Sequence, residues 1–267
     1  MSVKDYFDMM FSKGGKPSPA DVKRAEFIRD QIPDNTRTIL EVGCGTGTVT
    51  RALTENYKVT GLELSSVGVQ KVRELGITCV QGSIDELPFP DKSFDMVIAS
   101  EVLEHLDEEI FTKGLRQLAR VASRYILITV PNNERLQSYR KECPMCRSMF
   151  VPWGHIRSFR IETLRELFDD LNFVPMKIRT FGPRIPNRHN LISRLLMWHR
   201  WLYNPLGPGQ RCPICKYVVP GTPPHGIPTL ERLLERPLVE CTHILDFIAA
   251  KLSPKYQRWI LAIYKRQ

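Results

Sequence analysis

The stretch "ILEVGCGTGTVT", residues 39–50, decides the expected fold because three closely spaced glycines follow an apolar run. Gly43, Gly45 and Gly47 stand between a strand-like segment and a helix-like one, where glycines permit a tight turn and a close approach of backbone to ligand. Such a turn would also suit a dinucleotide. However, Glu41 lies in its approach, where a carboxylate is unfavourable beside a pyrophosphate but acceptable near a cation, and the spacing of the glycines is G-x-G-x-G, so both details weigh against a dinucleotide.

Outward from this turn, the first half of the chain alternates strand-like and helix-like segments. The strand-like runs are "RTILEV" (37–42), "YKVTGLEL" (57–64), "ITCVQG" (77–82), "FDMVIAS" (94–100) and "RYILITV" (124–130). Continuous apolar strands that alternate with helices are typical of a parallel sheet covered on both faces. A helix is also expected over 18–32, since Ser18 and Pro19 are typical of a helix start. The sequence therefore predicts an α/β fold.

Polar residues follow the second and third predicted strands. Glu63 lies at the end of the second strand, and its carboxylate can accept hydrogen bonds from both hydroxyls of a ribose. Ser83 and Ile84 follow the third strand in "GSIDELPF", and this polar and apolar pair suits the edge and the face of an adenine.

Five elements occur in order: "EVGCGTG", Glu63, "GSIDELPF", "FDMVIASEVLEHL" and "ILITVPN". Together they resemble the class I S-adenosylmethionine-dependent methyltransferases over most of residues 36–182 and the final strand, 258–265. The resemblance implies a Rossmann-like sheet of seven strands with the last strand antiparallel. It also implies that the glycines line the methionine end of the cofactor, Glu63 binds its ribose, and Ser83 with Ile84 contacts its adenine. The predicted cofactor-binding residues are Glu41, Gly43, Gly45, Gly47, Glu63, Leu64, Ser83, Ile84 and Ser100.

The segment "IASEVLEHL", residues 98–106, supplies the candidate catalytic groups. Glu101, Glu104 and His105 stand at positions i, i+3 and i+4, so a helical turn would direct all three outward from the end of a strand. Ligands bind at that edge in open α/β sheets. His155, in "WGHIRSF", is expected to reach the same crevice.

These four residues leave three interpretations open. Two carboxylates and two imidazoles suit Mg²⁺, Mn²⁺ or Zn²⁺, which would hold a substrate hydroxyl and lower its pKa. The pattern is similar to those of ubiquinone-pathway catechol O-methyltransferases and of enzymes that methylate the terminal 2′-hydroxyl of small RNAs. Alternatively, a histidine acts as a base or orients the acceptor without metal, or the residues form a solvated turn.

Two C-P-x-C motifs predict a zinc site. Cys143, Cys146, Cys212 and Cys215 offer four thiolates, and a closed tetrahedral set of four is typical of structural zinc. A redox pair and coincidence are the alternatives. The site would fold residues 183–240 back onto residues 143–155 as a small lid. Cys44, Cys79 and Cys241 are expected to be buried apolar groups, and this use of cysteine indicates a reducing compartment, the cytoplasm.

The expected organisation follows from these elements. It comprises an N-terminal helical cap (1–35), a cofactor-binding core (36–182), an insertion that shares the zinc site (183–240), and a final helix and antiparallel strand (241–267). The segment "MSVKDYFDMMFSKGG" is charged and lacks the apolar core of a signal peptide. No apolar run reaches the length of a membrane span.

The net charge of +9 is concentrated in the C-terminal third. Residues 184–267 carry 13 Lys/Arg against 4 Asp/Glu, whereas residues 1–183 carry 25 of each. This surface could meet anionic lipid, through the segment 191–203, or nucleic acid, or it is a merely solvated face. The favoured function is methyl transfer to an oxygen of a small molecule such as a sugar or a quinone precursor. A nucleic-acid methyltransferase is the alternative, and a non-catalytic module is disfavoured because the glycine turn and Glu63 are intact.

Overall fold

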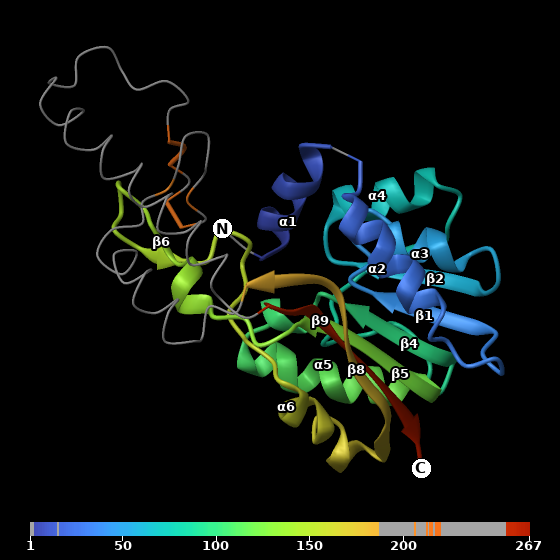
Figure 1. Ribbon diagram of the computed structural model, residues 1–267. Helices are drawn as coiled ribbons and strands as arrows, with labels where there is room; N and C mark the ends of the chain where they lie inside the picture. The colour runs from blue at the N-terminus through green and yellow to red at the C-terminus, as the bar shows by residue number, and fades with distance from the viewer. Residues whose placement is uncertain are drawn as a thin grey trace, which may run out of the picture. The chain divides into compact units, whose positions relative to one another are not determined.

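The computed structural model describes residues 3–14, 16–186, 206, 212, 214–215, 217–219 and 255–267. The chain divides into two compact units (Figure 1), which are described separately. The larger unit comprises Ser2–Glu134, Ile156–Pro183 and Gln257–Gln267, and the smaller one comprises Met1, Arg135–His155 and Arg184–Tyr256. The amphipathic segment 191–203 and the helix expected between residues 241 and 254 lie outside the described residues.

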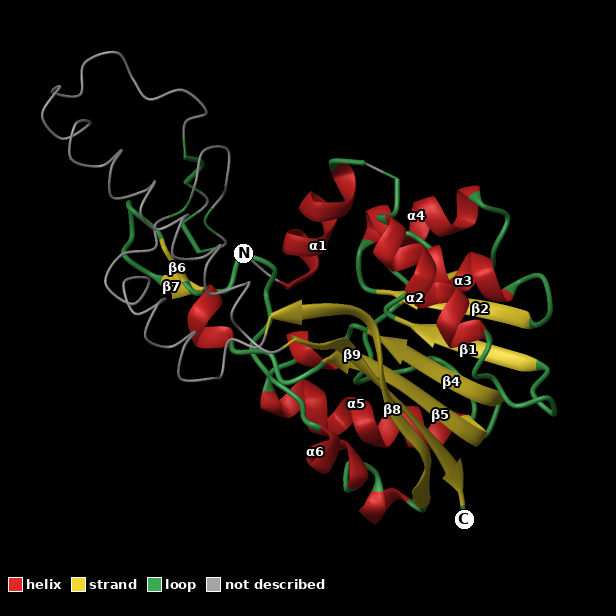
Figure 2. Cartoon of the chain, viewed as in Figure 1, coloured by secondary structure: helices red, strands yellow, loops and turns green. Residues whose placement is uncertain are grey.

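A seven-stranded sheet forms the centre of the larger unit (Figure 2). Its order is β3-β2-β1-β4-β5-β9-β8. The strands are β1 (Thr38–Val42), β2 (Lys58–Glu63), β3 (Cys79–Gln81), β4 (Phe94–Ser100), β5 (Ala122–Pro131), β8 (Phe173–Pro186) and β9 (Lys255–Arg266). Strands β1 to β5 are parallel, and β9 runs antiparallel to β5 with Thr129 opposite Leu261. The predicted seven-stranded Rossmann-like sheet is confirmed.

Helices cover both faces of this sheet. They are α1 (Val3–Ser12), α2 (Pro19–Arg29), α3 (Thr48–Leu53), α4 (Ser66–Glu74), α5 (Glu108–Val121) and α6 (Ile161–Arg165). The larger unit also has the short 3₁₀ helices η1 (Leu103–His105) and η3 (Asp169–Leu171), whereas η2 (Leu136–Tyr139) belongs to the smaller unit. Ser18 caps α2 as expected, since its hydroxyl accepts a bond of 3.2 Å from the Asp21 amide. The segment "RIETLRELFDDLNF" (160–173) predicts a single helix, and this prediction is wrong. The segment divides into α6 and η3, and two aspartates near its end would oppose the dipole of a longer helix.

Side chains of the sheet alternate between two hydrophobic cores. Val97 and Ile128 face the core covered by α5, whereas Ile98 and Leu127 face the core under α2 and α3. Both cores are fully excluded from water, as the continuous apolar strand sequences predict. The sheet is therefore a rigid support for the loops at its carboxyl edge.

The smaller unit contains a hairpin where only a loop was expected. Strands β6 (Lys141–Glu142) and β7 (Met149–Phe150) are antiparallel, with Lys141 opposite Phe150. The turn between them carries the first C-P-x-C motif. Within the described part of the chain, no helix is both long and apolar enough to span a membrane.

Candidate functional site

The glycine turn after β1 requires glycine for steric reasons. Gly43, Gly45 and Gly47 have φ of 72°, 55° and 85°, in the left-handed region that other residues rarely adopt. A Cβ on Gly43 would lie 2.5 Å from Val102 Cγ2, so this position cannot carry a side chain without displacing the turn after β4. The amide of Gly43 donates to the carbonyl of Leu62 at 2.8 Å, which attaches the turn to the end of β2.

Glu63 links the end of β2 to this turn. Its Oε2 accepts a bond of 2.8 Å from the Gly45 amide, and its Oε1 accepts one of 2.8 Å from the Ser65 amide. Burial raises the pKa of Glu63, while these bonds oppose the shift. Each carboxylate oxygen has a second lone pair, which leaves the group able to accept hydrogen bonds from a ligand.

Glu41 is a buried residue of β1, just before the glycine turn. The Thr50 hydroxyl of α3 donates to its Oε2 at 2.5 Å. Burial raises the pKa of Glu41 to about 8, and the bond from Thr50 and the charge of Arg24 partly oppose the shift. Glu41 is therefore mostly protonated near neutral pH and joins β1 to the helix that follows the turn.

The residues after β3 take different positions. The Ser83 hydroxyl donates to the Asp85 carboxylate at the surface of the loop. Ile84 is buried against α5, where Gly114 leaves room for it: a Cβ on Gly114 would lie 3.1 Å from Ile84 Cγ1. Ser83 therefore lies outside the hydrophobic core, and Ile84 lies within it.

Two further predicted cofactor residues lie at strand ends. The carbonyl of Leu64 accepts a bond of 3.2 Å from Gln81 Nε2, which joins the ends of β2 and β3. The hydroxyls of Ser100 and Thr129 are 2.8 Å apart and join the ends of β4 and β5. Together with the glycine turn, these residues form a continuous polar edge across β3, β2, β1, β4 and β5.

The turn after β4 differs from the expected helical turn. Glu101 has φ of 58°, and the chain continues as the 3₁₀ helix η1 rather than as an α-helix. Glu104 is fully buried, whereas Glu101 and His105 are partly exposed, so the predicted common outward face is wrong. A residue in the left-handed region interrupts helical geometry, and the tighter 3₁₀ turn changes the direction of each side chain.

Glu101 is held by residues from α2 and β9. Its Oε2 accepts a bond of 2.9 Å from Trp259 Nε1 and lies 3.8 Å from Arg24 Nη1. The Arg24 guanidinium also lies over the Trp259 ring, 5.2 Å from its centre. The ring fits because Gly182 has no side chain, since a Cβ there would collide with it. Sequence reasoning missed Arg24 and Trp259, because no local pattern indicates contacts so far apart in the chain.

Glu104 and His105 complete this turn. Burial and the neighbouring Glu101 charge raise the pKa of Glu104 well above its usual value. The carbonyl of Glu104 accepts bonds from the amides of Ile156 at 2.9 Å and Arg157 at 3.2 Å, which fix the turn. The ring of His105 meets that of Phe7 edge to face, with centroids 5.3 Å apart.

Helix α1 lies against the glycine turn. Asp8 accepts a bond of 2.5 Å from the Ser65 hydroxyl, and bonds from Lys4 and Ser65 lower its pKa to about 2. A Cβ on Gly45 would lie 3.5 Å from the Phe11 ring. The expected N-terminal cap therefore includes two residues, Asp8 and Phe11, that sequence reasoning did not assign to the site. Their helical period gave the only signal, since positions 7, 8 and 11 share one face.

His155 belongs to the smaller unit, where its Nδ1 accepts a bond of 3.0 Å from Trp153 Nε1. Its predicted role beside Glu104 and His105 stays a prediction.

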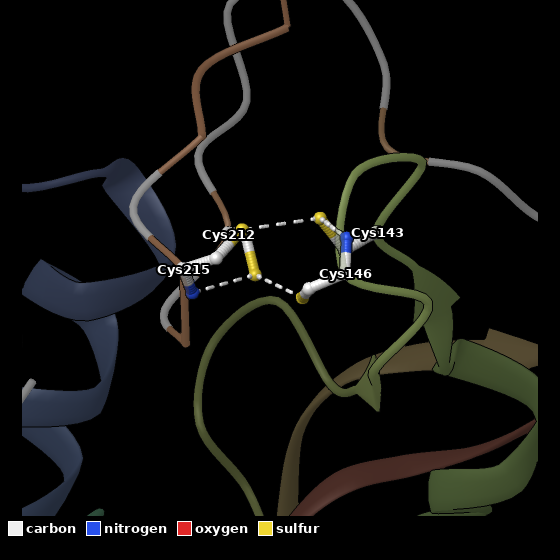
Figure 3. Close-up of side chains that lie close together, drawn as sticks. All are labelled: Cys143, Cys146, Cys212 and Cys215. Atoms are coloured by element: carbon white, nitrogen blue, oxygen red, sulfur yellow. Dashed lines mark hydrogen bonds between the residues drawn. The ribbon is translucent and has the colours of Figure 1, made fainter.

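The smaller unit brings the four motif cysteines together (Figure 3). Cys143 Sγ lies 3.6 Å from Cys215 Sγ, and Cys146 Sγ lies 3.7 Å from Cys212 Sγ. All four sulfurs lie within 4.8 Å of one another, although Cys146 and Cys212 are 66 positions apart in the sequence. These atoms form a compact group of potential metal ligands.

Comparison with known proteins identifies the larger unit. A family model described as a methyltransferase domain matches residues 39–124. The chain is 30% identical over 171 residues to 2-methyl-6-phytyl-1,4-hydroquinone methyltransferase of Synechocystis sp., with 59% of this chain and 52% of that protein covered. It is 39% identical over 92 residues to fatty-acid O-methyltransferase of Mycolicibacterium smegmatis, with 32% and 33% covered. The chain thus spans about half of the first relative and a third of the second.

Solved structures agree on the fold. A SAM-dependent methyltransferase from Archaeoglobus fulgidus superposes with a TM-score of 0.57 at 18% identity, covering 99% of this chain and 100% of that one. The strand order, the glycine turn after β1 and the acidic residue at the end of β2 occur together here. The larger unit therefore has the fold of a SAM-dependent methyltransferase structure, and its residues 39–124 match the methyltransferase domain model.

Proposed function

We propose that the protein transfers the methyl group of S-adenosylmethionine to an oxygen of a small-molecule acceptor. The observation that carries this proposal is the pairing of Glu63 with the Gly45 amide, beside the turn that presents His105. The first group suits a nucleoside cofactor, and the second suits proton removal from an acceptor. Both belong to the larger unit, at the carboxyl edge where open α/β sheets bind ligands.

The cofactor roles proposed for this edge follow its chemistry. Glu63 would accept the ribose hydroxyls, Ser83 and Ile84 would contact the adenine, and the glycine turn would face the methionine end. Calorimetry with S-adenosylmethionine and S-adenosylhomocysteine tests this arrangement, with a nicotinamide dinucleotide as the control. Binding of the dinucleotide alone would contradict the proposal.

The chemical step needs a base and a site from which water is excluded. When bound, S-adenosylmethionine supplies an electrophilic methyl group. An imidazole nitrogen of His105 would take the proton of the acceptor hydroxyl as the new oxygen–carbon bond forms and the carbon–sulfur bond breaks. The Phe7 ring beside His105 would exclude water from this face. These contacts favour an apolar or aromatic hydroxyl compound, and the two relatives act on a hydroquinone and a fatty acid according to their names.

His105→Asn tests the proposed base. We expect turnover to fall by about two to four orders of magnitude, because general bases contribute that much, while the affinity for S-adenosylhomocysteine stays unchanged. The assay follows methylated product by mass spectrometry, using hydroquinones and long-chain acids as first acceptors. An unchanged rate with an accepted substrate would exclude His105 as the base.

Metal-assisted transfer through Glu101, Glu104, His105 and His155 is the less favoured mechanism. Glu101 already accepts bonds from Trp259 and lies close to Arg24, which offsets its charge. A divalent ion would have to compete with that arginine. Chelation followed by addition of Mn²⁺ separates the two mechanisms, because only the metal-assisted one predicts recovery of the rate.

The nucleic-acid alternative rests on the basic C-terminal third. Most of that region, including the segment 191–203 proposed for membrane contact, lies outside the described residues. The small-molecule acceptor is supported by the contact between His105 and Phe7. Salt-dependent binding of RNA, measured by fluorescence anisotropy, would favour the alternative.

We also propose that the four motif cysteines hold one zinc ion in a structural role. Zinc–sulfur bonds of about 2.3 Å in a tetrahedron place neighbouring sulfurs about 3.8 Å apart. The observed separations of 3.6 and 3.7 Å agree with that value. They are far longer than a disulfide bond of about 2.05 Å. Four thiolates leave no open position, so the ion would take no part in methyl transfer.

A further inference from the structure

We infer that zinc binding drives the folding of the smaller unit, whereas the larger unit folds and binds its cofactor without the metal. This inference rests on the zinc site proposed above and goes beyond it, because it states which part of the chain needs the ion to fold. Four observations support it: the composition of the apolar cluster around the sulfurs, the bonds that the sulfurs accept, the separation of the two motifs, and the closure of the larger unit.

The sulfurs are the centre of the apolar cluster in the described part of the smaller unit. Its fully buried members are Cys143, Leu206 and Cys212, and partly buried groups around them include Phe150 and Tyr217. Two of the three buried members are cysteines of the motifs, so among the described residues the apolar packing is built around the candidate metal ligands themselves. Metal binding at such a site contributes directly to the stability of the segments that carry its ligands.

The two motifs form the same turn twice. The amide of Cys146 donates to Cys143 Sγ at 3.5 Å, and the amide of Cys215 donates to Cys212 Sγ at the same distance. The Ile214 amide adds a bond of 3.4 Å to Cys212 Sγ. Amide donors stabilise negative charge on sulfur, and such surrounding bonds orient the ligands of metal sites. Each turn is therefore prepared for two thiolates.

The turns also close in the same way. The Cys143 amide donates to the Ser148 carbonyl at 3.0 Å, and the Cys212 amide donates to the Tyr217 carbonyl at 2.8 Å. Among the described residues, one backbone bond joins the two segments, and it runs from the Leu206 amide to the Glu142 carbonyl at 3.1 Å. Holding together segments 66 positions apart opposes the entropy of a long loop, and a shared ion supplies the missing attraction.

In the larger unit, the residues on either side of segment 135–155 are bonded to each other. Asn132 forms a β-bridge with Phe159, and the Asn133 amide donates to the Phe159 carbonyl at 2.7 Å. The Arg160 side chain also donates to Asn133 Oδ1 at 3.2 Å. Residues 135–155 thus leave and rejoin the larger unit at two points that these bonds hold together. The glycine turn and Glu63 lie wholly in that unit, so they do not depend on the cysteines for their geometry.

The experiment uses the full-length protein purified under reducing conditions without chelator. Elemental analysis and native mass spectrometry measure bound metal, and we expect about one zinc per chain. After removal of zinc with a strong chelator, limited proteolysis is mapped by mass spectrometry. We expect new cleavage within residues 135–155 and 184–256, no new cleavage within residues 16–134, and unchanged affinity for S-adenosylhomocysteine. Added zinc should restore the original pattern.

Variants separate the possible failures. Cys143→Ser and Cys212→Ser should reproduce the metal-free pattern, whereas Cys241→Ser, which removes a thiol outside both motifs, should retain zinc. Protein without zinc, or with both motifs joined by disulfides, overturns the metal site. Zinc that can be removed with no change in proteolysis overturns the folding role alone. Loss of cofactor affinity on removal overturns the independence of the larger unit. Zinc-loaded protein that ignores S-adenosylmethionine overturns the methyltransferase proposal instead.

Discussion

Glu63 holds the glycine turn, and in the proposed function the same carboxylate also binds the ribose. Glu63→Gln keeps the size of the side chain but removes its charge and weakens the bonds from the Gly45 and Ser65 amides. We expect the dissociation constant for S-adenosylhomocysteine to rise about tenfold or more in calorimetry, equivalent to about 1.4 kcal/mol.

Asp95 provides a matched control for this change. Its Oδ2 also accepts bonds from two backbone amides, those of Arg37 and Thr38, but at the opposite end of β1. Asp95→Asn should lower the stability of the fold and leave cofactor affinity unchanged. Equal loss of affinity in both variants would mean that Glu63 acts only through the fold.

Glu41 predicts a pH dependence of stability. Its pKa is raised from 4.5 to about 8 in the folded protein, so the native state binds a proton that the unfolded state has released between those values. The free energy of unfolding should therefore fall as pH rises from about 5 to about 8, by on the order of a few kcal/mol. Glu41→Gln retains an acceptor for Thr50 and should weaken this decline. Thermal unfolding across the range measures it, and parallel curves for both proteins would refute the assignment.

At the scale of the element, α1 depends on a short set of polar contacts. Asp8 accepts bonds from Ser65 and from the Val67 amide at the start of α4, and the Lys71 side chain donates to the Phe11 carbonyl at 2.6 Å. Because Phe11 lies next to Gly45, loosening α1 should speed the release of bound cofactor. We expect Asp8→Asn to raise the dissociation rate of S-adenosylhomocysteine several-fold in stopped-flow displacement.

Glu26→Gln removes the same charge from an exposed position on α2 and is the control. An equal rate for Asp8→Asn and this control would show that α1 does not retain the cofactor.

Elements were predictable where their signals are local. The five parallel strands follow apolar runs bounded by turn residues, and the structure places all five there. The turn after β4 was not predictable in this way, because Glu101 takes its left-handed conformation in contact with Trp259, 158 positions away. The helix expected over 160–173 divides into α6 and η3, with the aspartates that oppose the dipole of a longer helix near its end.

At the scale of the whole molecule, the cofactor half of the site could be predicted further than the acceptor half. The glycine turn and Glu63 are adjacent to strands whose order the motif implies. Arg24, Phe7 and Trp259 come from elements that only the folded chain brings to the same edge. Such contacts leave no periodic pattern in the sequence, which is why the expected outward direction of Glu104 beside Glu101 and His105 was wrong.

Gly182 tests how far this long-range packing extends. It has φ of 86°, and a Cβ would collide with the Trp259 ring. Gly182→Ala should lower the free energy of unfolding by about 2–4 kcal/mol in urea, from backbone strain and overpacking together. Gly76→Ala is the control, because Gly76 also has positive φ, 77°, but no atom within 4 Å of a new Cβ. Equal losses in the two variants would mean that contact with the ring has no cost.

The missing side chain at position 182 also connects a remote strand to the edge that carries the proposed active site. Any side chain introduced there must displace the indole ring of Trp259. The nitrogen of that ring donates the hydrogen bond to the Glu101 carboxylate. Mutations on β8, which β5 and β9 separate from β4 in the sheet, should therefore alter the proposed methyl transfer without touching either substrate. In a screen for variants with changed activity, this distant glycine belongs among the first positions to examine.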